Sequence, residues 1–234
     1  MTPTEIRSVF QLLTDDEKGD KPRESQNGVK FRTICRDCNN QLGIQYDAVI
    51  NDFAIGVGRY LTSSLKLPAI INFRTKPARL IRGILGHLLS AKMEFESAVF
   101  DEQVRNILFD EKAELPQDIN VFFWVYPYPE TIIARDIVML AVRGDFSNVA
   151  MFQILKYFPI AYLVVTEPRY EGLDELTRFR DLGLDDEAEI PIRLGRVEHR
   201  HWPELVDRGN IVLGGASLEE SVWAKPRRKD RNPV

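Results

Sequence analysis

The spacing of apolar residues at the start of the chain predicts a helix, then a loop, then a short strand. Thr2 and Pro3 form a helix-capping pattern, and apolar residues from Ile6 to Leu13 recur at helical spacing. The N-terminal segment is therefore predicted to be a helix. Residues 14–28 are polar and rich in helix breakers, which predicts a loop. Residues 29–34 alternate apolar with charged side chains, which predicts a short strand.

Three further segments have the apolar periodicity of helices. These segments are residues 39–65, a helix that begins at Lys76-Pro77, and residues 97–109. In the second of them, a stripe of leucine and isoleucine lies along one face and the basic residues fall elsewhere. Residues 66–73, between the first two helices, are predicted to be extended.

The second half of the chain is rich in β-branched and aromatic residues. The runs at 119–126, 131–142 and 157–166 are predicted to be neighbouring strands of a mostly antiparallel sheet, and 190–194 a last strand. Residues 172–188 are polar and acidic, with one short helical pattern. The order of a helical half and then a β-rich half predicts an α+β fold.

Composition and charge restrict the class of protein. Of the 234 residues, 44% are hydrophobic and 28% are charged, which is ordinary for a globular protein able to bury a core. Neither a signal peptide nor a transmembrane run is recognisable, and two closely spaced cysteines fit a reducing compartment, so we expect a cytoplasmic location. We divide the chain into residues 1–65, residues 66–222 and a basic disordered tail at 223–234.

The net charge of −4 is unevenly distributed. Residues 225–234 hold five lysines and arginines and one aspartate, so this tail carries +4 and the body −8. An acidic body is not expected to bind DNA over its whole surface. The tail residues Arg227, Arg228 and Lys229 are candidates for contacts with phosphate, or with an acidic partner, although a solvated tail is the simpler interpretation.

Both cysteines of the chain lie in one short motif. Cys35 and Cys38 have the C-x-x-C spacing that turns two thiolates toward one metal ion. With the predicted strand before them and Asn39-Asn40-Gln41-Leu42-Gly43 after them, these residues resemble the second half of the finger of HNH endonucleases, a treble-clef family. The resemblance covers about fifteen residues, from Val29 to Gly43.

The resemblance implies a zinc site and a nucleic-acid setting. Cys35 and Cys38 would be zinc ligands, and Asn39 would fix the finger loop at the start of a helix. An active member also needs a first C-x-x-C pair, a catalytic histidine and a divalent cation, but residues 1–34 contain neither cysteine nor histidine. The chain would therefore be a truncated or degenerate nuclease.

The three histidines are the other candidate metal ligands. His199 and His201 are separated by one residue, so on a strand both would point to one face and could complete a zinc site with Cys35 and Cys38. A surface histidine pair is the alternative interpretation. His87 lies beside the apolar stripe of its helix, and we expect it to contact the core or another helix rather than to catalyse a reaction.

Phosphate binding has one candidate site in the body of the protein. Arg74, Lys76, Arg79 and Arg82 surround a predicted helix start, which favours anions, although a solvated helix face is the simpler interpretation. The aromatic run at 122–126 could stack on bases, but buried strand residues are the preferred interpretation.

These observations support more than one function. The leading hypothesis is an HNH-like, nuclease-derived protein that acts on or near DNA or another nucleic acid, with catalysis weak or lost. The rival hypothesis is a non-enzymatic interaction protein with a remnant finger and a protein partner. A third is a small-ligand site in the β-rich half. The oligomeric state and the substrate do not follow from the sequence.

Overall fold

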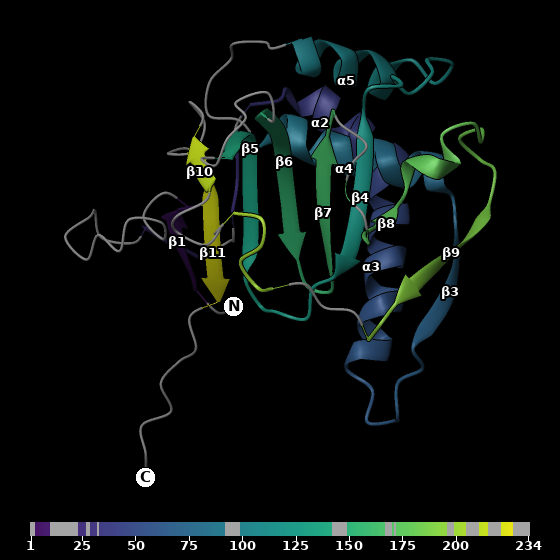
Figure 1. Ribbon diagram of the computed structural model, residues 1–234. Helices are drawn as coiled ribbons and strands as arrows, with labels where there is room; N and C mark the ends of the chain where they lie inside the picture. The colour runs from purple at the N-terminus through teal and green to yellow at the C-terminus, as the bar shows by residue number, and fades with distance from the viewer. Residues whose placement is uncertain are drawn as a thin grey trace.

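The protein is an α+β structure, as the sequence predicts, with helices packed on one face of an antiparallel sheet (Figure 1). A computed structural model describes residues 3–9, 23–26, 29–31, 33–91, 99–141, 149–166, 170, 172–195, 199–204, 211–214 and 221–226. Within this described part, no helix is long and apolar enough to cross a membrane.

The helices form where the sequence predicts them. The segment predicted at 39–65 is helix α2 (Arg36–Leu42), a π-helical turn η1 (Gly43–Asp47) and helix α3 (Ala48–Leu61). Helix α4 (Pro77–Ser90) begins with proline, whose missing N–H costs nothing at a helix start. Helix α5 (Val99–Phe109) matches the third predicted helix. Leucine and isoleucine side chains of α4 are fully buried, which anchors the helical layer.

Most strands of the main sheet come from the second half of the chain, and their order is not the sequence order. The sheet runs β2-β1-β11-β5-β6-β7-β4-β8, with β10 also paired to β5, and every pairing between these strands is antiparallel. A second, two-stranded sheet joins β3 (Ile70–Thr75) to β9 (Ala188–Arg193). The strands of the main sheet are β1 (Thr4–Ser8), β2 (Arg23–Ser25), β4 (Asn120–Val125), β5 (Thr131–Ala141), β6 (Val149–Tyr157), β7 (Ile160–Val165), β8 (Asp174–Glu175), β10 (Ile211–Gly214) and β11 (Val222–Pro226).

The central strands are buried on both faces. Along β4, Val121 and Phe123 belong to a hydrophobic cluster that also contains side chains of α3 and α4. Phe122 and Trp124 belong to a second cluster, and because neighbouring residues of a strand point to opposite faces, this cluster lies on the other side of the sheet. The aromatic run at 122–126 is therefore buried core, which confirms the preferred interpretation.

The predicted strand neighbours are partly wrong. The structure inserts β6, which the sequence analysis did not predict, and β5 pairs with β6 while β4 pairs with β7. The runs at 119–126 and 131–142 are therefore not adjacent, although the runs at 119–126 and 157–166 are. The acidic region forms β8 and a 3-10 turn η2 (Thr177–Phe179) instead of the predicted short helix.

The N-terminal predictions are also corrected. Residues Thr4–Ser8 form strand β1 rather than a helix, because they pair with β11 on one side and β2 on the other. The described residues of 29–34 belong to no strand, and Val29 instead lines a cavity with Ile50 and Ile133. The remainder of the predicted first helix, from Phe10 to Leu13, lies outside the described residues.

The hydrophobic core crosses the boundary predicted at residue 65. The cluster under the helices joins Phe53 of α3 to Phe123 of β4, whose rings lie edge to face with centroids 6.2 Å apart. The predicted disordered tail is corrected at its start, because residues 223–226 belong to β11 and hydrogen-bond to β1 and β5. Arg227, Arg228 and Lys229 lie outside the described residues.

Candidate functional site

The two cysteines meet at the start of helix α2. Cys35 is the N-cap residue, with extended backbone (φ −66°, ψ 159°), and its Sγ accepts a hydrogen bond of 3.1 Å from the backbone N–H of Cys38. The two Sγ atoms lie 2.7 Å apart, and the backbone N–H of Asn39 donates to the Cys35 carbonyl. The capping geometry thus turns both thiols to the same side of the helix start.

The two thiols are electrostatically different although they are neighbours. The hydrogen bond with the Cys38 thiol, helped by the Cys38 backbone N–H, lowers the pKa of Cys35 below its usual value. The same thiol–thiol bond, together with partial burial, raises the pKa of Cys38. Cys35 is exposed and Cys38 is half-buried, so solvent reaches the pair. A thiolate at this place would be held by a backbone donor.

The donor set of the pair fits part of a zinc site. Two thiolates on one side of a helix start are the soft ligands that zinc prefers, but tetrahedral zinc takes four ligands. No group of three or more His, Cys, Asp or Glu residues that could hold a metal ion occurs among the described residues. Within the part of the chain that the structure describes, Cys35 and Cys38 would therefore supply at most two of the four ligands that such a site needs.

His199 and His201 do not complete this site. Leu42 of α2 packs on the cluster beneath the helices, whereas Trp202 packs on the cluster at the opposite face of the sheet. The predicted four-residue site is therefore corrected, because the sheet separates the cysteine pair from the histidine pair. The histidine rings lie 6.3 Å apart, and burial beside Arg200 lowers the pKa of His201.

Residues 199–204, which include His199 and His201, cover a buried ion pair that the sequence pattern did not reveal. The ammonium of Lys156 on β6 is completely buried and lies 2.6 Å and 2.7 Å from the two carboxylate oxygens of Glu204. It also donates to the carbonyls of Arg200 and Trp202, which fastens this segment to the sheet. Burial lowers the pKa of Lys156 and raises that of Glu204. The sequence signal for this ion pair was a lysine, Lys156, within an apolar run.

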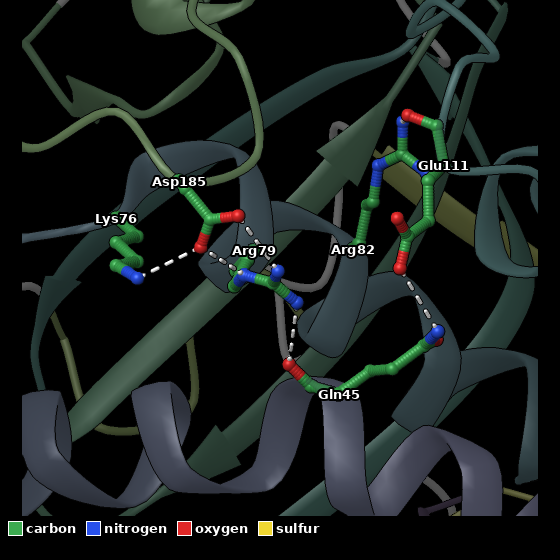
Figure 2. A network of polar contacts seen from close by, with 6 residues as sticks. All are labelled: Gln45, Lys76, Arg79, Arg82, Glu111 and Asp185. Atoms are coloured by element: carbon green, nitrogen blue, oxygen red, sulfur yellow. Dashed lines mark hydrogen bonds and ion pairs between the residues drawn. The ribbon is translucent and has the colours of Figure 1, made fainter.

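The basic residues around the start of α4 have partners within the chain. Arg74 Nε lies 2.6 Å from Glu187, and Lys76 Nζ lies 2.8 Å from Asp185. The guanidinium of Arg79 donates one hydrogen bond of 3.2 Å to each oxygen of the same Asp185 carboxylate, and it also donates to the Gln45 carbonyl (Figure 2). These cations lower the pKa of Asp185 to about 2, with the Arg79 hydrogen bond the largest cause.

Arg82 differs from its three basic neighbours because it is buried. Its guanidinium donates to the carbonyls of Ile107, Asp110, Glu111 and Ala113, and so holds the end of α5 and the turn after it. Glu111 in turn accepts a hydrogen bond from Gln45 (Figure 2). Phosphate binding by Arg74, Lys76, Arg79 and Arg82 stays a prediction, and it would require these internal partners to be exchanged.

His87 lies at a contact between two helical segments. Its Nε2 is 3.7 Å from a carboxylate oxygen of Asp47, and this imidazole lowers the pKa of Asp47. The ring is half-exposed and borders a cavity of about 400 Å³ between α3, α4 and strands β5 and β6. The expectation of a helix–helix contact is confirmed, although the residue is not in the core.

Comparisons with known proteins identify no relative of this chain. Searches of protein-family models, of curated proteins and of solved structures give no match to this chain.

Proposed function

We propose that this chain is an HNH-like, nuclease-derived protein that binds zinc through Cys35 and Cys38 and acts on or near nucleic acid. One observation carries the proposal: both thiols lie together at the start of a helix, where Cys35 caps α2 and contacts Cys38. This is the position expected for the helix-borne cysteine pair of such a finger. The backbone N–H of residue 39 donates to the Cys35 carbonyl, so the turn that holds the two cysteines is closed by a helical hydrogen bond.

The proposed role of the metal is structural. Zinc held by thiolates stabilises a finger by joining segments that have little core of their own. Helix α2 fits this description, because none of its residues is buried. Cys35 and Cys38 would hold the ion, and Asn39 would keep the loop between them in place.

We propose that nuclease activity is weak or lost. Hydrolysis of a phosphodiester by an HNH-like site needs a histidine base near the finger and a divalent cation on the scissile phosphate. His87 is the histidine nearest in sequence to Cys38, and its ring is engaged with Asp47 across a helix contact. A carboxylate from residues 15–17 could bind a cation, but it could not replace a neutral imidazole base near pH 7.

A second candidate function is a non-enzymatic protein–protein interaction module. The pairing of Arg74, Lys76 and Arg79 with Asp185 and Glu187 favours it, because these cations are already neutralised within the fold. Such a surface attracts a nucleic acid less strongly than an unpaired basic cluster would.

Elemental analysis of the purified chain tests the metal site. We expect bound zinc in the wild-type chain and its loss in the Cys35→Ser, Cys38→Ser double variant. An Asn40→Ser, Gln41→Ser variant is the matched control, because these exposed residues lie on the same helix. Equal metal content in all three proteins would contradict the proposed site.

Two assays separate the nucleic-acid hypothesis from the interaction hypothesis. Fluorescence anisotropy with a labelled DNA duplex should show binding that weakens with salt, as phosphate contacts do. Plasmid incubated with the chain and Mg²⁺ should stay uncut. Absence of DNA binding at low salt would favour the interaction module, and Mg²⁺-dependent cutting by the wild-type chain that the double-serine variant loses would contradict the proposed loss of catalysis.

A further inference from the structure

Among the described residues, the proposed zinc site of one chain has only two of its four ligands. Tetrahedral structural zinc takes four protein ligands, and Cys35 and Cys38 provide two. The described residues bring no third histidine, cysteine, aspartate or glutamate to this pair. Cys35 and Cys38 are also the only cysteines in the sequence, so further thiolates must come from another molecule.

The surface around the pair is open to another molecule. Cys35 is exposed and Cys38 is half-buried, and no residue of α2 is buried by the rest of the described chain. Arg36 and Asp37, between the two cysteines, are exposed as well. An approaching chain could therefore reach both Sγ atoms.

We propose that the zinc site is shared by two copies of this chain, each of which contributes Cys35 and Cys38 to one ion. The inference rests on the proposed function, because it requires the cysteine pair to bind zinc. Two identical pairs give the four thiolates of a closed Cys₄ site, and a twofold axis through the metal would relate them.

The charges beside the pair suit contact between identical surfaces. A twofold interface brings the same patch of both copies together, so a patch of one sign would repel itself. Arg36 and Asp37, the two residues between the cysteines, carry opposite charges and are both exposed. The cation of one copy can then face the carboxylate of the other, and net repulsion at the shared ion is avoided.

The proposal makes dimerisation depend on zinc. Because the ion binds two chains at once, zinc stabilises the dimer by mass action, and its removal releases monomers. The expected stoichiometry is one zinc for two chains. A serine at either cysteine leaves at most one thiolate per copy, so each single variant should lose the dimer.

Sedimentation velocity of the full chain, with zinc chloride as the titrant and EDTA as the competitor, tests this inference. We expect a monomer in EDTA and a dimer after half an equivalent of zinc. Cys35→Ser and Cys38→Ser should stay monomeric at every zinc concentration, whereas the Asn40→Ser, Gln41→Ser control should dimerise as the wild type does. Circular dichroism of each variant checks that it is folded.

Each other outcome overturns the inference in a recognisable way. A monomer that binds one zinc per chain would contradict the shared site but leave the proposed function intact. Failure to bind zinc at all would contradict both. A dimer that persists in EDTA and in the serine variants would place the interface elsewhere. Substitution with Co²⁺ adds an independent readout, since four thiolates give strong sulfur-to-cobalt charge-transfer absorption in the dimer only.

Discussion

At the scale of single residues, the ammonium of Lys156 shows how a polar group is fitted into an apolar sheet. It is buried completely, yet each of its donors has an acceptor on the segment 200–204. The rings of Trp124 and Tyr126 lie within 6.0 Å and 5.1 Å of the ammonium and shield it from water. An ion pair in such surroundings is costly to break from one side.

Removal of one partner of this ion pair should destabilise the fold strongly. Lys156→Met leaves the Glu204 carboxylate buried without its cation, and we expect a loss of about 3–5 kcal/mol in the free energy of unfolding. The double variant Lys156→Met, Glu204→Leu removes both charges and should lose less than Lys156→Met alone. Urea denaturation measures all three proteins. Additive losses in the double variant would show that the pair does not act as a unit.

Asp185 should give the stability of the protein a specific acid dependence. Its pKa in the folded state is lowered to about 2 by Arg79 and Lys76, below the usual value of 3.8. The stabilisation from this carboxylate is therefore present above about pH 4 and is lost as the pH falls toward 2. The urea midpoints of wild type and Asp185→Asn should differ near neutral pH and converge at low pH. Asp181→Asn, an exposed carboxylate nearby, is the control.

At the scale of elements, the packing of α3 on β3 depends on the absence of a side chain at one helical position. A Cβ added to Gly56 would lie 2.1 Å from Cε2 of Phe73, and the Phe73 ring packs edge to face on Phe53. The glycine lowers helix propensity, but it lets the strand approach the helix closely. Helix α3 extends through Gly56 because this packing outweighs its poor propensity.

Substitution of this glycine should cost stability. Gly56→Ala forces the Phe73 ring to move, and we expect a loss of about 1–3 kcal/mol from overpacking. Gly86→Ala in α4 is the matched control, because its new Cβ would meet nothing closer than 3.5 Å and should raise stability by about 0.5–1 kcal/mol. Thermal and urea unfolding of both variants measure the difference. A neutral Gly56→Ala would mean that α3 and β3 are less tightly packed.

Elements with their own periodicity could be predicted from the sequence, and those defined by distant partners could not. Helix α4 has an apolar stripe and an initial proline, so local pattern was sufficient. A helical capping pattern precedes strand β1, but this strand pairs with β2 and with β11, which lies more than 200 residues later in the chain. Strand β6 holds the buried Lys156 and Gln153, which interrupt its apolar pattern. Long-range pairing outweighs local propensity in β1, whereas β6 pairs with its sequence neighbours β5 and β7 and was obscured by its own buried polar residues.

At the scale of the whole molecule, the late strand β11 pairs with β1, the first strand of the chain, and with β5, near the centre of the sheet. It lies between β1 and β5, with Ala224 opposite Ile6 on one side and Thr131 on the other. Ala224 is 2% exposed, so this strand is part of the packed structure. Removal of its pairing would leave the edges of both neighbouring strands open.

A charge on β11 should therefore destabilise the protein strongly, although the strand lies close to the end of the sequence. Ala224→Asp buries a carboxylate without a partner, and we expect a loss of more than about 3 kcal/mol. Lys225→Ala, at the exposed neighbouring position, should change stability by less than about 0.5 kcal/mol. Urea denaturation with intrinsic tryptophan fluorescence compares the two. Equal stability of both variants would contradict the placement of β11 in the sheet.

The candidate site was predictable only as far as the C-x-x-C spacing. That spacing placed Cys35 and Cys38 together, because a capping turn needs only neighbouring residues. The relation of the pair to His199 and His201 depends on which face of the sheet each segment packs against, which local pattern does not encode. The internal partners of the basic residues at α4 likewise come from a loop about 110 residues later, at Asp185 and Glu187.

The central claim is that Cys35 and Cys38 bind zinc, and X-ray absorption at the zinc edge of the purified chain tests it most directly. Thiolate ligands place sulfur about 2.3 Å from the ion, whereas nitrogen and oxygen ligands lie at about 2.0–2.2 Å. We predict a shell dominated by sulfur, with four sulfur atoms if two copies share the ion. A zinc shell without sulfur, or no zinc bound when the metal is supplied in excess, would contradict the claim.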